Sequence, residues 1–222
     1  MNMEQNNIGI VYLLTNECMP GLVKIGMTSR ESMDARLKEL YTTGVPMPFE
    51  CVYACKVDCY KELERALHDA FEPYRVNPSR EFFRIKTSQV MGILRLFDKG
   101  NITSEVVTEL EKQQEDESAE DGSEQVKTKV YRRPAQNYFE MGLKEGDVLT
   151  YVHDSSVTCI VKSERKVEYN GQLTHLTPIT TELLKAKRSV QPTPHWEFNG
   201  RNLSDLYEEW QERVSKESTE ED

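Results

Sequence analysis

A strongly acidic stretch without large apolar side chains interrupts the chain near its middle. Residues 113–125 read QQEDESAEDGSEQ, and residues 101–125 carry 9 acidic side chains and 1 basic one. Such a segment cannot bury enough apolar surface to offset the chain entropy that folding removes. We therefore expect a flexible linker here, and a chain of 222 residues that is divided into separately folded domains.

The negative charge of the protein lies almost entirely in this stretch and in the C-terminal tail. The formal net charge is −10, yet residues 1–100 hold 13 basic and 13 acidic side chains, and residues 126–213 hold 13 and 12. Nucleic acid is therefore not excluded as a partner, because basic patches can form on two near-neutral blocks. The expected organisation is a first domain at 1–100, a helix end and linker at 101–127, a second domain at 128–214, and an acidic tail at 215–222.

Several classes of protein are disfavoured by the sequence. No apolar run approaches the ~18 residues that span a membrane, and the first residues lack the basic and apolar regions of a secretion signal. The five cysteines have no disulfide spacing, which favours reduced thiols in a cytoplasmic protein. Cys51, Cys55 and Cys59 do not match an iron–sulfur triad, because Asp58 stands where a cysteine is needed. We interpret them as small buried residues, with Cys51 and Cys55 on one face of a strand.

The first block alternates between strand and helix patterns. Strands are expected at 8–15, 22–27, 49–57 and 82–85, and helices at 28–40, 58–74 and 87–97. Pro20-Gly21 marks a turn that makes the first two strands a hairpin. Thr28 and Glu31 fit a capping box that opens the first helix, and Asp58 is expected to cap the second. This order predicts an α+β domain with a small, mainly antiparallel sheet flanked by helices.

The second block predicts a separate small α+β domain. Short strands are expected at 147–152, 157–162 and 166–169, and Gly171 makes a turn. Helices are expected at 178–187 and 203–214. Between these helices lies a segment rich in turn formers, residues 192–200, around Trp196.

The first block carries an ordered array of polar and aromatic residues. It consists of Tyr12, Lys24-Ile25-Gly26, Arg36-Leu37, Glu64, His68 and Arg80-Glu81-Phe82-Phe83. Over residues 8–86 this array resembles the GIY-YIG nuclease superfamily, and particularly its branch of small phage and bacterial proteins. Ile10-Val11-Tyr12 stands where the family name has Gly-Ile-Tyr, and Lys24 stands where it has the second tyrosine.

The resemblance implies metal-dependent hydrolysis of phosphodiester bonds in DNA. It makes Glu64 the ligand of Mg²⁺ (or Mn²⁺), Arg36 the clamp on the phosphate, and Tyr12 with Lys24 the pair that activates water. These residue types suit the reaction, because a hard cation and a guanidinium stabilise the extra negative charge of the transition state. His68 is expected either to relay a proton or hydrogen-bond near Glu64, or to be a rim histidine bonded to the backbone.

Each of these residues also has an ordinary structural interpretation. Tyr12 would be a half-buried sheet residue, Lys24 a solvated lysine, and Arg36 and Glu64 surface charges on helices. A helical wheel favours the site: Glu64 and His68 share the rim of a stripe formed by Leu63, Ala66, Leu67, Ala70 and Phe71. Glu81 either braces the site or forms an ion pair with Arg80, and the phenylalanines that follow it are expected in the core.

The second block resembles the restriction-enzyme and adenine-methylase associated (RAMA) domain over residues 138–210. The motifs are Gly142-Leu143-Lys144-Glu145-Gly146-Asp147, Val167-Glu168-Tyr169-Asn170-Gly171, Leu176-Thr177-Pro178, Trp196-Glu197-Phe198-Asn199-Gly200 and Leu203. The resemblance implies a reader of DNA, including modified DNA. Tyr169, His195, Trp196 and Phe198 are candidates to stack on a flipped base, and the alternative is that Trp196 fills a small core.

A basic segment precedes this second block. Lys127, Lys129, Arg132 and Arg133, together with Tyr131, would make an arm that follows the DNA backbone, or else a solvated linker end. The sequence as a whole predicts a DNA endonuclease with a DNA-reading module that acts in restriction of foreign DNA. The alternative is a non-catalytic DNA-binding regulator on a decayed nuclease scaffold, which Lys24 and Ile10 favour.

Overall fold

The computed structural model divides the chain into two compact units. Unit 1 comprises residues 1–119 with 184–187, and unit 2 comprises 120–183 with 188–222. The structure describes residues 8–29, 49–120 and 135–220, and within these it describes 112–120 and 215–220 by their backbone alone. No helix in this part of the chain is long and apolar enough to cross a membrane. The predicted α+β class with a small antiparallel sheet flanked by helices is confirmed.

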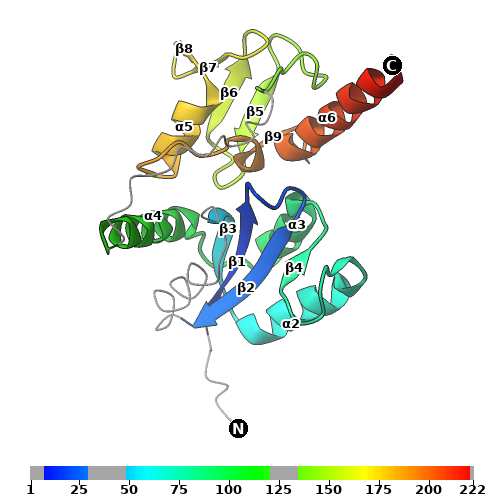
Figure 1. Cartoon of the computed structure of the whole chain (residues 1–222). Helices are drawn as coiled ribbons and strands as arrows, with labels where there is room; N and C mark the ends of the chain where they lie inside the picture. Colours follow the sequence, from blue (N-terminus) through cyan, green and yellow to red (C-terminus); the bar gives the residue numbers. More distant parts are fainter. Residues whose placement is uncertain (1–7, 30–48, 121–134, 221–222) are drawn as a thin grey trace. The chain divides into compact units, whose positions relative to one another are not determined.

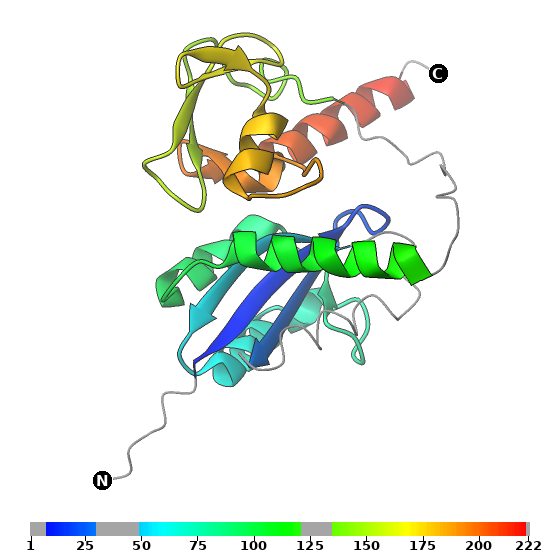
Figure 2. The same cartoon turned by 90° about the vertical axis from the view of Figure 1, so that its left-hand side faces the viewer.

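Unit 1 is built on a four-stranded antiparallel sheet with the strand order β3-β1-β2-β4 (Figure 1). Its elements are β1 (Gly9–Asn16), β2 (Val23–Ser29), β3 (Phe49–Val57), α2 (Tyr60–Ala70), a 3-10 turn (Glu72–Tyr74), β4 (Phe82–Phe83), α3 (Thr87–Phe97) and α4 (Thr103–Glu120). Figure 2 shows α4 across one face of the sheet and α2 behind it. The central strand β1 is apolar at consecutive positions because both of its faces are buried.

A β-bulge changes which side chains of β3 face α4. The pairing register between β1 and β3 shifts between Leu13 and Leu14. Cys51 therefore joins Ala54 in the cluster that packs against α4. Cys55 pairs opposite Val11 and points to the other face. The prediction that Cys51 and Cys55 share a face is wrong, because strict alternation does not continue through a bulge.

The predicted helix starts in unit 1 are also corrected. Thr28 lies in β2, where its hydroxyl donates to the Ser29 carbonyl (3.2 Å); the rest of the helix expected at 28–40 lies outside the described residues. The N-cap of α2 is Cys59, with φ of 53° and no side-chain cap bond. Asp58 forms an ion pair with Lys99 (3.6 Å) instead of capping α2. The buried positions of α2 are Tyr60, Leu63, Leu67 and His68, whereas Ala66 and Ala70 are exposed.

The acidic stretch is partly helical. The backbone of α4 continues to Glu120, through residues 113–120 that we expected in the linker. Val106 and Leu110 anchor the start of this helix in the core. Glu, Gln, Lys and Ala are good helix formers, so an anchored helix extends through them at little cost. Residues 121–125 lie outside the described residues.

Unit 2 holds a six-stranded antiparallel sheet with the order β10-β9-β5-β6-β7-β8. Its elements are β5 (Val148–Tyr151), β6 (Thr158–Val161), β7 (Val167–Tyr169), β8 (Gln172–Thr174), α5 (Leu176–Leu183), a 3-10 turn (Thr193–His195), β9 (Trp196–Phe198), β10 (Arg201–Asn202) and α6 (Leu203–Glu220). Leu206 and Trp210 of α6 pack into one core with Leu149 and Trp196. The segment predicted as turns around Trp196 therefore supplies a strand inside the sheet.

Candidate functional site

Tyr12 and Gly26 lie in very close contact in the sheet of unit 1. They face each other on β1 and β2, and the Tyr12 side chain is only 1% exposed. A Cβ atom added to Gly26 would lie 2.6 Å from Cε2, Cζ and Oη of Tyr12. The far end of the tyrosine ring therefore lies over Gly26, and only a residue without a side chain leaves room for it.

Lys24 precedes Gly26 by two residues and lies on the same face of β2. It is 7% exposed, and its Nζ lies 2.6 Å from Oε2 of Glu81. The ammonium group also sits 5.2 Å from the centroid of the Phe82 ring. The interpretation of Lys24 as a solvated lysine is wrong, because burial of an ammonium group requires a charged partner and Glu81 supplies one. Glu81 has this ion pair with Lys24 in place of the one expected with Arg80.

Glu64 and His68 approach β2 from α2. His68 Nε2 lies 3.1 Å from the Ile25 carbonyl oxygen and 3.4 Å from Oε1 of Glu64. The imidazole ring packs against Phe83, with the two centroids 5.1 Å apart. The side chain of Glu64 is 15% exposed and that of His68 is 11% exposed. His68 therefore links the helix that carries Glu64 to the middle of the β2 motif.

These contacts meet at the outer edge of β2, along residues 24–26. The Ile25 N–H donates to the Glu81 carbonyl (3.2 Å), and in a strand the C=O of the same residue points to the same side. His68 therefore binds at that edge, beside the Lys24–Glu81 pair. Tyr12 reaches the same stretch of β2 from the face, over Gly26. Four of the five predicted catalytic residues thus border one short segment; the fifth, Arg36, lies outside the described residues.

The capacity of this region to hold a metal rests on one carboxylate. Within the described ranges, no group of three or more His, Cys, Asp and Glu side chains is placed to bind an ion. Glu64 with its neighbour His68 is compatible with Mg²⁺, which is commonly held by one or two carboxylates and several waters. The cysteines offer no alternative site: all five are free, and burial raises the pKa of the Cys55 thiol to about 12.

Two of the stacking candidates predicted in unit 2, Trp196 and His195, are buried. Trp196 is fully buried, and its indole N–H donates to the Thr180 hydroxyl (2.8 Å). Trp196 therefore cannot stack on a base, and the alternative that it fills a small core is correct. His195 is also buried, with its Nδ1 2.8 Å from Nε2 of His153. Tyr169 is partly buried against the same core.

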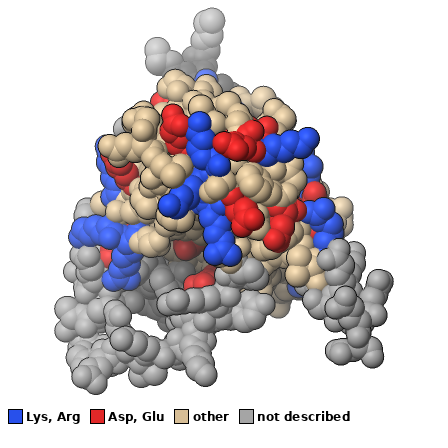
Figure 3. Space-filling view, turned by 90° about the horizontal axis from the view of Figure 1, so that it is seen from above, with Lys and Arg blue, Asp and Glu red and all other residues tan. Residues whose placement is uncertain are grey.

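The basic arm cannot be placed on the structure. Lys127, Lys129, Arg132 and Arg133 lie outside the described residues. On the face shown in Figure 3, Lys and Arg side chains are interspersed with Asp and Glu rather than gathered alone. Lys162 of unit 2 forms an ion pair with Glu168 (2.9 Å).

Comparison with known protein families found a match within unit 1. Residues 9–98 match the T5orf172 domain family. This domain family is associated with nucleases, which supports a nuclease-like or DNA-binding function. The matched segment contains Tyr12, residues 24–26, Glu64, His68 and Glu81. Comparisons with curated proteins and with solved structures found no match.

Sequence reasoning missed two roles that the structure makes plain. Glu81 was recognised as a polar residue near the site, but its partner Lys24 lies 57 positions away in the chain, and no local pattern reveals it. The motif at residues 24–26 by itself gives Gly26 no role of its own. The signal was a glycine in the interior of a strand, which often marks a close approach of another group.

Proposed function

We propose that the protein is a metal-dependent DNA endonuclease of the GIY-YIG type. The observation that carries this proposal is that residues 24–26 of β2 are bordered by Tyr12 and Lys24 on one sheet face and by the Glu64–His68 pair of α2 at the strand edge, inside the segment that matches a nuclease-associated family. Unit 2 would be a DNA-reading module of the RAMA type. Such an enzyme would act in the cytoplasm, in restriction of foreign DNA, including base-modified DNA.

The proposed roles follow from the placement of the side chains. Glu64 would hold Mg²⁺ or Mn²⁺, and the bound cation would stabilise negative charge on the phosphate. Tyr12 would take a proton from the attacking water, with the Lys24 ammonium on the same sheet face favouring the phenolate. Arg36 would clamp the phosphate through its planar guanidinium. His68 hydrogen-bonds at Ile25 and so would position α2 rather than touch the substrate.

A non-catalytic DNA-binding protein is the second candidate function. The observation that favours it is the burial of two of the catalytic candidates. Lys24 is buried and neutralised by Glu81, and the Tyr12 side chain is 1% exposed. A scaffold that had lost catalysis could retain such contacts for stability alone.

Cleavage of plasmid DNA by the full chain, with Mg²⁺ or Mn²⁺, tests the proposal. Glu64→Gln keeps the size of the side chain but removes the charge that would hold the cation, and we expect cleavage to fall by roughly a hundredfold or more. Glu62→Gln is the matched control, because Glu62 is an exposed glutamate in the first turn of the same helix. Equal cleavage by both variants would remove Glu64 from the mechanism. DNA binding without cleavage of any plasmid, modified or not, would favour the regulator.

A further inference from the structure

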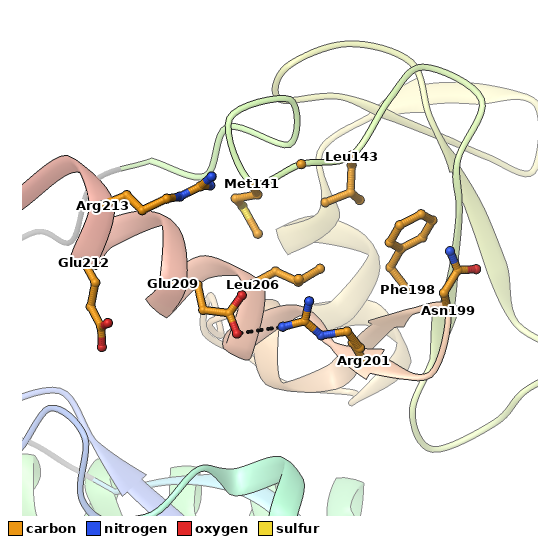
Figure 4. Close-up of a pocket in the computed structure, with 10 residues that line it drawn as sticks. Met141, Leu143, Phe198, Asn199, Arg201, Leu206, Glu209, Glu212 and Arg213 are labelled. Atoms are coloured by element: carbon orange, nitrogen blue, oxygen red, sulfur yellow. Dashed lines mark hydrogen bonds and ion pairs between the residues drawn. The ribbon is translucent and has the colours of Figure 1, made fainter.

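Unit 2 contains a pocket that is separate from the site in unit 1 (Figure 4). Its volume is about 570 Å³, which is in the range of small-molecule binding sites. Three segments form it: the turn before β5, the hairpin between β9 and β10, and one face of α6. All its lining residues belong to the described part of the chain.

The floor of the pocket is apolar and already fixed by packing. Met141, Leu143 and Leu206 are 4%, 2% and 8% exposed and are members of the core of unit 2. Phe198 packs against the same core while remaining partly exposed. A floor held by core residues does not need to be ordered when a ligand binds, which lowers the cost of binding. Phe198 supplies one ring face for a flat ligand.

The rim of the pocket is polar and balanced in charge. Arg201 forms an ion pair with Glu209 (2.6 Å), and Arg213 donates to the Glu140 carbonyl (2.7 Å). Glu212 adds a second carboxylate to the lining. Two arginines against two glutamates favour a neutral ligand over a phosphate group or a charged peptide.

Asn199 offers the most specific polar group of the rim. It sits in the β9–β10 turn with φ of 49°, followed by Gly200 with φ of 76°, directly beside Phe198. Figure 4 shows the Asn199 amide next to the Phe198 ring. Within the described residues, neither the Asn199 amide nor the Glu212 carboxylate has a hydrogen-bond partner. Both are therefore available to a ligand.

A flat, neutral ligand with apolar faces and a hydrogen-bonding edge is a nucleobase. Aromatic rings bind bases by stacking, an Asn amide pairs with the N6 and N7 atoms of adenine, and a carboxylate accepts from an exocyclic amine. A base inside a duplex cannot enter a pocket unless it is extruded from the stack. We propose that this pocket binds one base that carries an exocyclic amine, extruded from DNA. The inference rests on the proposed action of the protein on DNA.

The test measures DNA binding by the full chain with Glu64→Gln, without Mg²⁺, so that cleavage does not interfere. Three duplexes differ at one central position: an adenine–adenine mismatch, a thymine–thymine mismatch, and an abasic site. All three are easily opened there, but only the first supplies a base with an amine. Loss of a base–aromatic stack costs ~1–3 kcal/mol, so we expect the adenine mismatch to bind roughly 5- to 150-fold more tightly than the abasic duplex. The duplex with the thymine mismatch should bind more weakly than the duplex with the adenine mismatch.

Two variants assign this preference to the pocket. Asn199→Gly removes the amide while keeping the left-handed backbone conformation, and Phe198→Leu removes the ring while keeping an apolar side chain. Both should abolish most of the preference for the adenine mismatch. Val157→Ala is the control, because Val157 packs against the same core but does not line the pocket.

The possible outcomes of this test distinguish a failure of the pocket assignment from a failure of the proposed function. Binding of all three duplexes with equal affinity, or a preference that survives both pocket variants, would overturn the pocket assignment and leave the nuclease proposal untouched. Calorimetric binding of free deoxyadenosine monophosphate as tight as that of the mismatched duplex would identify a free nucleotide as the ligand and overturn extrusion. A full chain that binds none of the duplexes at low salt would overturn both proposals.

Discussion

The contact between Tyr12 and Gly26 predicts that a single methyl group at position 26 damages both the fold and the site. In Gly26→Ala the new Cβ would stand 2.6 Å from three atoms of the Tyr12 side chain, whereas ordinary contacts begin near 3.4 Å. The ring is buried on the central strand, so it cannot move aside into solvent. The tyrosine or β2 must shift by close to an ångström, away from the arrangement that brings Tyr12 to residues 24–26.

Two effects of opposite sign decide how much Gly26→Ala changes the free energy of unfolding. Replacing a strand glycine by alanine gains roughly 0.5–1 kcal/mol from reduced backbone entropy of the unfolded chain. Overpacking a well-filled core costs roughly 1–3 kcal/mol. The steric term is the larger one, so we expect a net loss of roughly 1–2 kcal/mol in the free energy of unfolding, measured by chemical denaturation. Cleavage should fall more steeply than stability, because the displaced residue is the one proposed to activate water.

A control glycine and a double mutant make this test specific. A Cβ at Gly92, an exposed position in α3, would meet nothing within 4 Å, so Gly92→Ala should stabilise the protein. In a Tyr12→Leu background the obstructing ring is gone, and Gly26→Ala should then cost little. The coupling energy between the two positions should therefore be large, at the upper part of the ~0.5–3 kcal/mol seen for residues in contact. Additive effects of the two substitutions, or a stabilising Gly26→Ala, would refute the steric reasoning.

Three further substitutions test other contacts. Glu81→Gln removes the counter-charge of the buried Lys24 and should lower the free energy of unfolding by roughly 1–3 kcal/mol. The kcat of cleavage should fall by a larger factor than KM changes. An unchanged kcat would make the Lys24–Glu81 pair purely structural. Arg36→Lys keeps a positive charge but loses the bidentate fork, and single-turnover cleavage should slow by roughly 10²–10³-fold; a rate equal to wild type would make Arg36 a surface charge. Burial lowers the pKa of His195 to about 3, so the unfolded chain takes up the proton first as pH falls below about 6.5, and stability is lost from there towards pH 3. Between pH 7 and 5.5 this loss should reach roughly 1.4 kcal/mol, and melting of His195→Gln should lack that part of the pH dependence.

The fold of unit 1 was largely readable from the sequence, and the errors have local causes. The alternation of apolar residues at 49–57 predicted β3 with its observed bounds, although the bulge breaks that alternation and leaves both faces of the strand buried. The bulge between Leu13 and Leu14 could not be foreseen, because it depends on pairing with another strand. The cap of α2 was misplaced by one residue: the N-cap is Cys59, in a left-handed conformation and without a side-chain cap bond, and Asp58 pairs with Lys99 instead.

In unit 2 two Asn-Gly dipeptides carry hairpin signals. Asn170-Gly171 and Asn199-Gly200 both have positive φ at each residue, as two-residue hairpin turns of the primed type require. The first joins β7 to β8 and the second joins β9 to β10. Strands of two or three residues carry too little periodicity to be recognised by alternation. The dipeptides themselves were the available evidence for β8, β9 and β10.

The site was predictable as a set of residues but not as a set of contacts. Motif order placed Tyr12, Lys24, Glu64 and His68 on three elements, and the structure brings those elements together at β2. The ion-pair or hydrogen-bond partner of each polar group depends on the tertiary structure. Lys24 binds Glu81 because β4 pairs with β2 at Lys24 and Phe82, which sets the residue before Phe82 beside the lysine.

The two aromatic residues of β9 show why a candidate stacking residue cannot be chosen from sequence alone. Trp196 and Phe198 are two positions apart on one strand and so share a face. Trp196 pairs with Tyr151 in the middle of the sheet, where α5 supplies Thr180 to its indole N–H. Phe198 pairs with Arg201 at the hairpin end, where the sheet stops and the pocket begins. The larger ring was the more attractive candidate, but distance from the end of the strand decides which ring a ligand can reach.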